Sequence, residues 1–155
     1  MNAQFLPPGK GSYFVWFRLA EALEFECGAL GTVRLGAGWA GYAGSALGHG
    51  GLAARLRRHL GSGTRLHWHI DYLRSHVTMT EFWFSQEPER LEHLWAGVAA
   101  GLPGAQLPAR GFGSSDCGCE SHLVHLPVRP VFADFGRAVT GRAPRHFTML
   151  RHRLG

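Results

Sequence analysis

Runs of aromatic and β-branched residues, bounded by glycine and polar positions, predict several strands along the chain. The first is residues 11–19 (GSYFVWFRL), which begins with glycine and is apolar at most positions. Residues 32–35 and 39–44 fit two short strands, and residues 77–84 (VTMTEFWF) fit a longer one. A last strand is expected around residues 122–126. The predicted strands are therefore spread over most of the chain.

Helical periodicity is clearest in residues 51–60, where Leu52, Leu56 and Leu60 recur at intervals of four. Other helices are expected at residues 67–75, at 87–100 with Pro88 near the first turn, and after Pro130. The basic tail, residues 142–155, has no periodic pattern and is assigned no element. Together these segments predict a mixed α+β domain whose small, mainly antiparallel central sheet is flanked by helices.

The length and the hydropathy of the chain fit one globular domain. It has 155 residues, of which 45% are hydrophobic, enough for one core. Residues 35–54 carry no charge and could span a bilayer, but seven glycines interrupt them, so we expect a strand and a glycine-rich loop. The first ten residues lack an apolar secretory segment, and three cysteines do not suit a secreted disulfide framework. The sequence predicts a cytoplasmic protein without a membrane partner.

The charge of the chain favours a polyanionic partner. The formal net charge is +5, and Lys10 is the only lysine beside fifteen arginines. A guanidinium group can hold a phosphate through two parallel hydrogen bonds, which an ammonium group cannot do. Codon bias in a GC-rich genome would give the same composition. The arginines therefore suggest nucleic acid as a partner without establishing it.

Candidate chemistry lies in three segments that the predicted elements could bring together. Tyr13 follows the glycine that opens the first strand, and Tyr42 stands near the end of another. Arg55 and His59 are four residues apart and so share one face of the helix at 51–60. A glycine loop precedes that helix, so its backbone could approach a phosphate closely. Glu92 adds a carboxylate of the kind that binds hard divalent cations.

In this order the residues resemble the GIY-YIG nuclease superfamily. Tyr13 and Tyr42 match the tyrosines of the two motif halves, and residues 42–59 (YAGSALGHGGLAARLRRH) match the loop and helix that carry Arg55 and His59. Glu92 matches the metal-binding glutamate, with Glu89 as a competitor. The chain departs from the motifs in having Ser12 and Ala43 in place of the two isoleucines.

Within this superfamily the chain is similar to a branch of uncharacterised domains that are sometimes fused to endonuclease III-type DNA glycosylases. Residues 67–73 (HWHIDYL) and 111–123 (GFGSSDCGCESHL) resemble signatures of that branch. The branch often has a cysteine at the position of His93 and an acidic residue at that of Leu94. The resemblance covers residues 9–126 and leaves 127–155 as a C-terminal extension with a basic tail.

The resemblance implies a divalent-metal-dependent endonuclease that hydrolyses nucleic-acid phosphodiesters, with DNA favoured over RNA. Glu92 would hold one Mg²⁺ or Mn²⁺ ion, and Arg55 would clamp the phosphate oxygens. Tyr13, helped by His59 or Tyr42, would orient or deprotonate the attacking water. A phenol is a weak base near neutral pH, so Arg55 or the metal would have to favour the phenolate.

Several other residues have two possible roles each, one in binding and one in the structure. Cys117, Cys119 and His122, with His93, could bind Zn²⁺, or the cysteines could be a buried reduced pair. A further set could contact nucleic acid or could belong to a solvated helix face and a helix cap: Arg57, Arg58, His67 and His69.

Three function classes follow from these readings. The first is the nuclease. The second is a catalytically inactive, zinc-stabilised module that binds nucleic acid. The third is a protein-interaction domain in which the arginine content is incidental.

Overall fold

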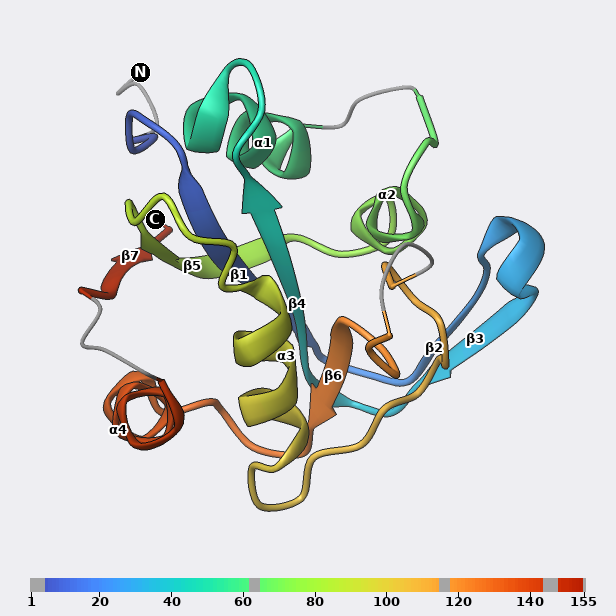
Figure 1. Ribbon diagram of the computed structural model, residues 1–155. Coiled ribbons are helices and arrows are strands. Elements are labelled where there is room, and N and C mark those ends of the chain that lie inside the picture. Colours follow the sequence, from blue (N-terminus) through green and yellow to red (C-terminus); the bar gives the residue numbers. More distant parts are fainter. Residues whose placement is uncertain (1–4, 62–64, 115–117, 144–147, 155) are drawn as a thin grey trace.

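The computed structural model describes residues 5–61, 65–114, 118–143 and 148–154. A five-stranded antiparallel sheet in the order β6-β4-β1-β5-β7 forms its centre, and β2 and β3 pair as a separate hairpin (Figure 1). The elements in chain order are β1 (Gly11–Leu19), β2 (Leu23–Glu26), the 3-10 turn η1 (Gly28–Leu30), β3 (Thr32–Leu35), β4 (Gly38–Ala46), α1 (Gly51–Leu60), α2 (His69–Arg74), β5 (Met79–Ser85), α3 (Glu92–Ala100), β6 (Leu123–Leu126), α4 (Phe132–Arg142) and β7 (Leu150–Arg153).

The central strand β1 divides the apolar interior into two cores. Successive side chains of a strand point to opposite faces of the sheet. Tyr13, Val15 and Phe17 therefore pack with α1 and α2, whereas Phe14 and Trp16 pack with α3 and α4. Because β1 is covered on both faces, it reads as a continuous apolar run and shows no polar alternation.

The expected mixed α+β class and the antiparallel sheet are confirmed. The helix expected at 87–100 begins later, at Glu92. The preceding backbone is held elsewhere, because Ser12 Oγ accepts a hydrogen bond from the Leu91 N–H at 3.0 Å. The helix expected at 67–75 is the shorter α2, whose Asp71 carboxylate accepts hydrogen bonds from the backbone N–H groups of His67 and Trp68.

The uncharged stretch 35–54 is indeed a strand and a glycine-rich turn. It contains all of β4, and α1 begins at Gly51 with a φ of 59°. A Cβ at Gly51 would lie 2.4 Å from the Gly9 carbonyl oxygen, so a side chain is excluded there. No helix within the described ranges is long and apolar enough to cross a membrane.

The described residues of the expected C-terminal extension, 127–143 and 148–154, supply a helix to one core and a strand to the central sheet. Phe135 and Val139 of α4 are buried in the core that also contains Trp95 of α3. The strand β7 pairs antiparallel with β5 and so forms one edge of the central sheet. The segment expected to be an unassigned basic tail thus supplies a strand.

Candidate active site

A cavity of about 740 Å³ opens near one end of the central sheet. Four of the residues expected in the active site line it: Tyr13, Tyr42, Arg55 and Glu92. They come from β1, β4, α1 and α3, so both helical layers contribute to one concave surface. The remaining lining residues are Gly44, Ser45, Leu47, Gly48, His67, Trp68, His69, Arg90, His93, Gly113 and His122.

Glycines make room for the two tyrosine rings. Tyr13 is opposite Gly44 in the β1–β4 register, and a Cβ at Gly44 would lie 2.4 Å from the Tyr13 ring. Gly113 has a φ of +68°, and a Cβ there would lie 2.6 Å from the Tyr42 ring. The glycine of the Tyr42-Ala43-Gly44 segment is therefore needed to place Tyr13, the tyrosine of the other strand.

His59 lies behind Tyr13 and does not line the cavity. The Tyr13 hydroxyl and His59 Nε2 are hydrogen-bonded at 2.8 Å, and both side chains are buried. Burial lowers the pKa of His59 to about 3, so its imidazole is neutral at pH 7. In the described part of the chain, no group hydrogen-bonds to Nδ1 of His59. His59 therefore positions Tyr13 and does not face a substrate.

Tyr13 is a neutral phenol in this arrangement. Burial raises the pKa of Tyr13, and the negative charge of Glu92 raises it further, while the Arg55 guanidinium opposes both effects. Burial likewise raises the pKa of Tyr42. Proton transfer from Tyr13 to His59 is strongly unfavourable because it would create two buried charges. Of the two cations that the sequence analysis named, Arg55 lowers the pKa of Tyr13 but does not outweigh burial.

Arg55 and Trp68 form the side of the cavity that α1 and α2 supply. The Arg55 guanidinium carbon lies 4.3 Å from the centre of the Trp68 ring, within cation–π range. This contact fixes the guanidinium group while its donors stay near the cavity. Trp68 was not expected to be a site residue, because a tryptophan beside a short helix is usually core.

Glu92, the first residue of α3, is mostly buried at the cavity wall. It is the only acidic residue among the described residues that line the cavity. Its Oε1 atom accepts hydrogen bonds from Ser45 Oγ and from Arg90 Nη1, the latter at 2.6 Å. Its competitor Glu89 is exposed and does not line the cavity. No sequence pattern indicated Ser45 or Arg90 as partners of Glu92.

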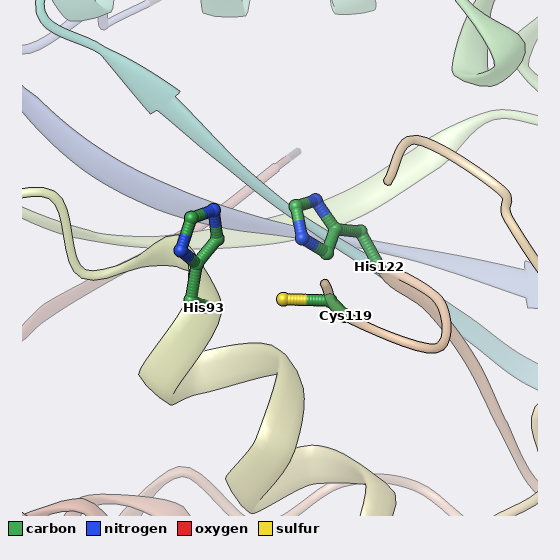
Figure 2. A group of neighbouring side chains, drawn as sticks. All are labelled: His93, Cys119 and His122. Atoms are coloured by element: carbon green, nitrogen blue, oxygen red, sulfur yellow. The ribbon is translucent and has the colours of Figure 1, made fainter. Parts of the chain in front are cut away.

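A histidine and cysteine cluster adjoins Glu92. One side-chain ligand atom from each of His93, Cys119 and His122 lies within 4.8 Å of the other two (Figure 2). Glu92 oxygens lie 3.7 Å from Nε2 of His93 and from Nδ1 of His122. Cys117, which the sequence grouped with these residues, lies outside the described residues.

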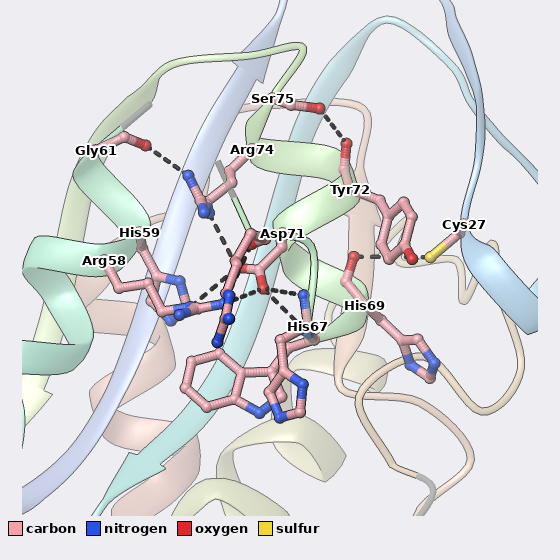
Figure 3. A network of polar contacts seen from close by, with 12 residues as sticks. Cys27, Arg58, His59, Gly61, His67, His69, Asp71, Tyr72, Arg74 and Ser75 are labelled. Carbon is pink, nitrogen blue, oxygen red and sulfur yellow. Dashed lines mark hydrogen bonds and ion pairs between the residues drawn. The ribbon is translucent and has the colours of Figure 1, made fainter. Parts of the chain in front are cut away.

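The four residues expected either to contact nucleic acid or to belong to a solvated helix face and a helix cap occupy different environments. Arg58 forms an ion pair within the protein, since its Nη2 donates to the Asp71 carboxylate at 2.7 Å (Figure 3). His69 Nδ1 accepts a hydrogen bond from the Gly113 N–H at 2.8 Å and so secures that loop against the cavity. His67 is exposed at the cavity mouth, whereas Arg57 is exposed but does not line the cavity.

A comparison with family models places these features in a family. The model described as "Domain of unknown function DUF123" matches residues 12–151, nearly the whole chain. No curated protein and no solved structure matches the chain. The match includes every residue that lines the cavity and extends over α4 and into β7. The chain therefore belongs to the DUF123 family of domains of unknown function.

Proposed function

We propose that this domain is a divalent-metal-dependent nuclease of the GIY-YIG type that cleaves nucleic-acid phosphodiesters, with DNA favoured. The observation that carries the proposal is the common cavity of Tyr13, Tyr42, Arg55 and Glu92, which lie far apart in the sequence. Phosphodiester hydrolysis requires a positioned water, neutralisation of developing charge and stabilisation of the leaving oxygen. This cavity contains residue types suited to each task.

Arg55 would bind the phosphate. Arg90 provides a second guanidinium group at the same cavity, although it is paired with Glu92. Arg55 has no carboxylate partner among the described residues, so its charge is available to an anionic ligand. Stacking against Trp68 holds the group in place before a substrate arrives, which lowers the entropy lost on binding.

Tyr13 would orient the attacking water. Its hydroxyl is fixed by His59, and its neutral form can donate to or accept from a water in the cavity. Because burial keeps both groups neutral, His59 acts by holding the Tyr13 hydroxyl in one direction. Tyr42, on the neighbouring strand, offers a second hydroxyl at the cavity wall.

Glu92 fits a role as ligand of one Mg²⁺ or Mn²⁺ ion. Mg²⁺ is commonly held by one or two carboxylates together with waters and substrate phosphate. Arg90 and Ser45 both bind Oε1 of Glu92, so Oε2 is the oxygen left for an ion. Such an ion would polarise a phosphate oxygen and stabilise the leaving group.

The proposal is tested with a panel of single-stranded, duplex, nicked and flapped DNA and with RNA, each with Mg²⁺ or Mn²⁺. Arg55→Ala should lower turnover by about 10²–10³-fold, because one preorganised contact to the transition state is lost. Arg137→Ala is the matched control, since Arg137 is exposed on α4 and does not line the cavity. Absence of cleavage for every substrate with both metals would refute the nuclease proposal.

The second candidate is a nucleic-acid-binding module that has lost catalysis. The neutral pair of Tyr13 and His59 and the pairing of Glu92 with Arg90 favour it, because each of these side chains already has a partner within the protein. Salt-dependent binding to nucleic acid without cleavage of any substrate in the panel would select this candidate.

A further inference from the structure

We propose that His93, Cys119 and His122 form a transition-metal site that binds Zn²⁺ at the Glu92 side of the cavity. The three side chains come from the first turn of α3 and from the loop that precedes β6, and they converge in Figure 2. The inference goes beyond the proposed function, because it concerns a different ion and different ligands from the single Mg²⁺ or Mn²⁺ ion at Glu92.

The ligand types select the metal. Thiolate and imidazole bind Zn²⁺ well, whereas Mg²⁺ takes oxygen ligands. Tetrahedral coordination with bonds of about 2.0–2.3 Å places ligand atoms roughly 3.3–3.8 Å apart. The three ligand atoms lie within 4.8 Å of one another, so small side-chain rotations would close the site.

The surroundings of the cluster suit a site with three protein ligands. His93 and His122 line the cavity, whereas the partly exposed Cys119 does not. Metal-bound imidazoles are usually oriented by a carboxylate on the other ring nitrogen. The Glu92 carboxylate lies 3.7 Å from one ring nitrogen of each histidine, so a negative charge adjoins both imidazoles. An ion held by these three residues would lie next to the cavity, because two of its ligands line that cavity.

The remaining described cysteine provides a contrast. Cys27 is buried beside α2, where its thiol donates to the His69 carbonyl oxygen. Burial raises the pKa of the Cys27 thiol to about 11, which disfavours the thiolate that a metal requires. Of the described cysteines, only Cys119 lies beside two imidazoles.

The test uses the full chain without an affinity tag. Elemental analysis of protein purified without chelator should find about one equivalent of zinc per chain. Titration of the metal-free protein with Co²⁺ should produce a thiolate-to-cobalt charge-transfer band that Zn²⁺ abolishes. Cys119→Ser should eliminate that band, and His93→Ala should weaken Zn²⁺ binding by at least 10-fold. Glu92→Gln should weaken it by about 10–100-fold, because the negative charge beside both imidazoles is lost.

Two control variants should bind Zn²⁺ as the parent does: Cys27→Ser, and His67→Ala at the same cavity outside the cluster. His93 is exposed on α3, so His93→Ala is expected to keep the fold if Cys119→Ser does not. The proposal is overturned if no thiolate band forms, if the band survives in Cys119→Ser, or if His93→Ala binds Zn²⁺ like the parent. These readouts do not use cleavage, so the two proposals can fail separately. A protein that binds Zn²⁺ and cleaves no substrate would refute the nuclease proposal and support the zinc site.

Discussion

Two buried carboxylates, Asp71 on α2 and Glu92 on α3, lie in opposite kinds of environment. Asp71 is fully buried and accepts hydrogen bonds from Arg58, Arg74 and two backbone N–H groups. Glu92 has two donors on one oxygen, while its other oxygen faces His122 across 3.7 Å. Asp71 is enclosed by the protein, whereas Glu92 opens onto the cavity.

The difference separates a structural charge from a candidate functional one. Burial alone would raise the pKa of Asp71, but the hydrogen bonds from Arg58, Trp68, His67 and Arg74 outweigh burial and hold that pKa well below its usual range. The network also joins α1 to α2, because Arg58 belongs to α1 and Asp71 to α2 (Figure 3). Asp71 thus supports the side of the cavity that holds Trp68.

The largest expected effect is on stability, from Asp71→Asn. Removing the charge leaves the two guanidinium groups without their counterion, and the free energy of unfolding should fall by about 3–5 kcal/mol. Chemical denaturation measures this change. Glu24→Gln, which breaks an exposed ion pair with Arg34, is the control and should change stability by about 1 kcal/mol or less. Equal effects of the two substitutions would contradict the structural role of Asp71.

Glu92→Gln should instead act on turnover. If the domain is a nuclease, metal-dependent cleavage should fall by about 10²–10³-fold, while stability falls less than in Asp71→Asn, because the partner Arg90 is half-exposed. Glu89→Gln is the matched control, because Glu89 is exposed and outside the cavity. Steady-state kinetics and thermal unfolding of both variants separate the two effects. A larger loss of activity in Glu89→Gln than in Glu92→Gln would identify Glu89 as the metal ligand instead of Glu92.

A smaller effect concerns pH. Because burial lowers the folded-state pKa of His59 from 6.5 to about 3, only the unfolded chain takes up this proton between those values. Stability should therefore decrease as pH falls through this window, and His59 accounts for about 2 kcal/mol of the loss between pH 7 and pH 5. Unfolding of His59→Gln should show a weaker pH dependence by that amount. If His59→Gln and the parent showed the same pH dependence of stability, His59 would take up its proton as readily in the folded protein as in the unfolded chain.

The smallest effect distinguishes two neighbouring arginines. Arg57→Ala removes an exposed charge on α1 and should lower the slope of log affinity against log salt by about one, with little sequence preference. Arg58→Ala should lower stability, because it removes a partner of buried Asp71. Binding titrations at several salt concentrations, combined with unfolding curves, measure both. A salt slope that Arg57→Ala leaves unchanged would exclude Arg57 as a phosphate contact.

The sequence predicted most of the sheet because its strands are apolar on both faces. Residues 11–19 form β1 as expected, and residues 51–60 form α1 because the leucine period matches the helix. Two strands were missed, β2 (LEFE) and β7 (LRHR). Both are short and largely exposed, so pairing with a neighbouring strand stabilises them and no apolar pattern marks them.

The candidate site was predicted unevenly for a similar reason. Tyr13, Tyr42, Arg55 and Glu92 stand in motif order, so the sequence indicated their convergence. The partners Ser45, Trp68 and Arg90 reach the cavity through tertiary packing alone, which no local pattern encodes. Arg58 was expected at nucleic acid or on a solvated helix face, whereas it forms a half-buried ion pair with Asp71. Burial of a charge depends on the whole fold.

The pairing of β7 with β5 has a consequence for the association of this domain with itself. β5 carries the aromatic run Phe82, Trp83 and Phe84, and β7 occupies its outer hydrogen-bonding edge. The new edge presents Arg151 and Arg153, whose charges repel a second copy. A chain cut before Leu150 would expose a long aromatic strand with unpaired backbone groups. We expect such a chain to aggregate through β5, even if the cavity stays intact.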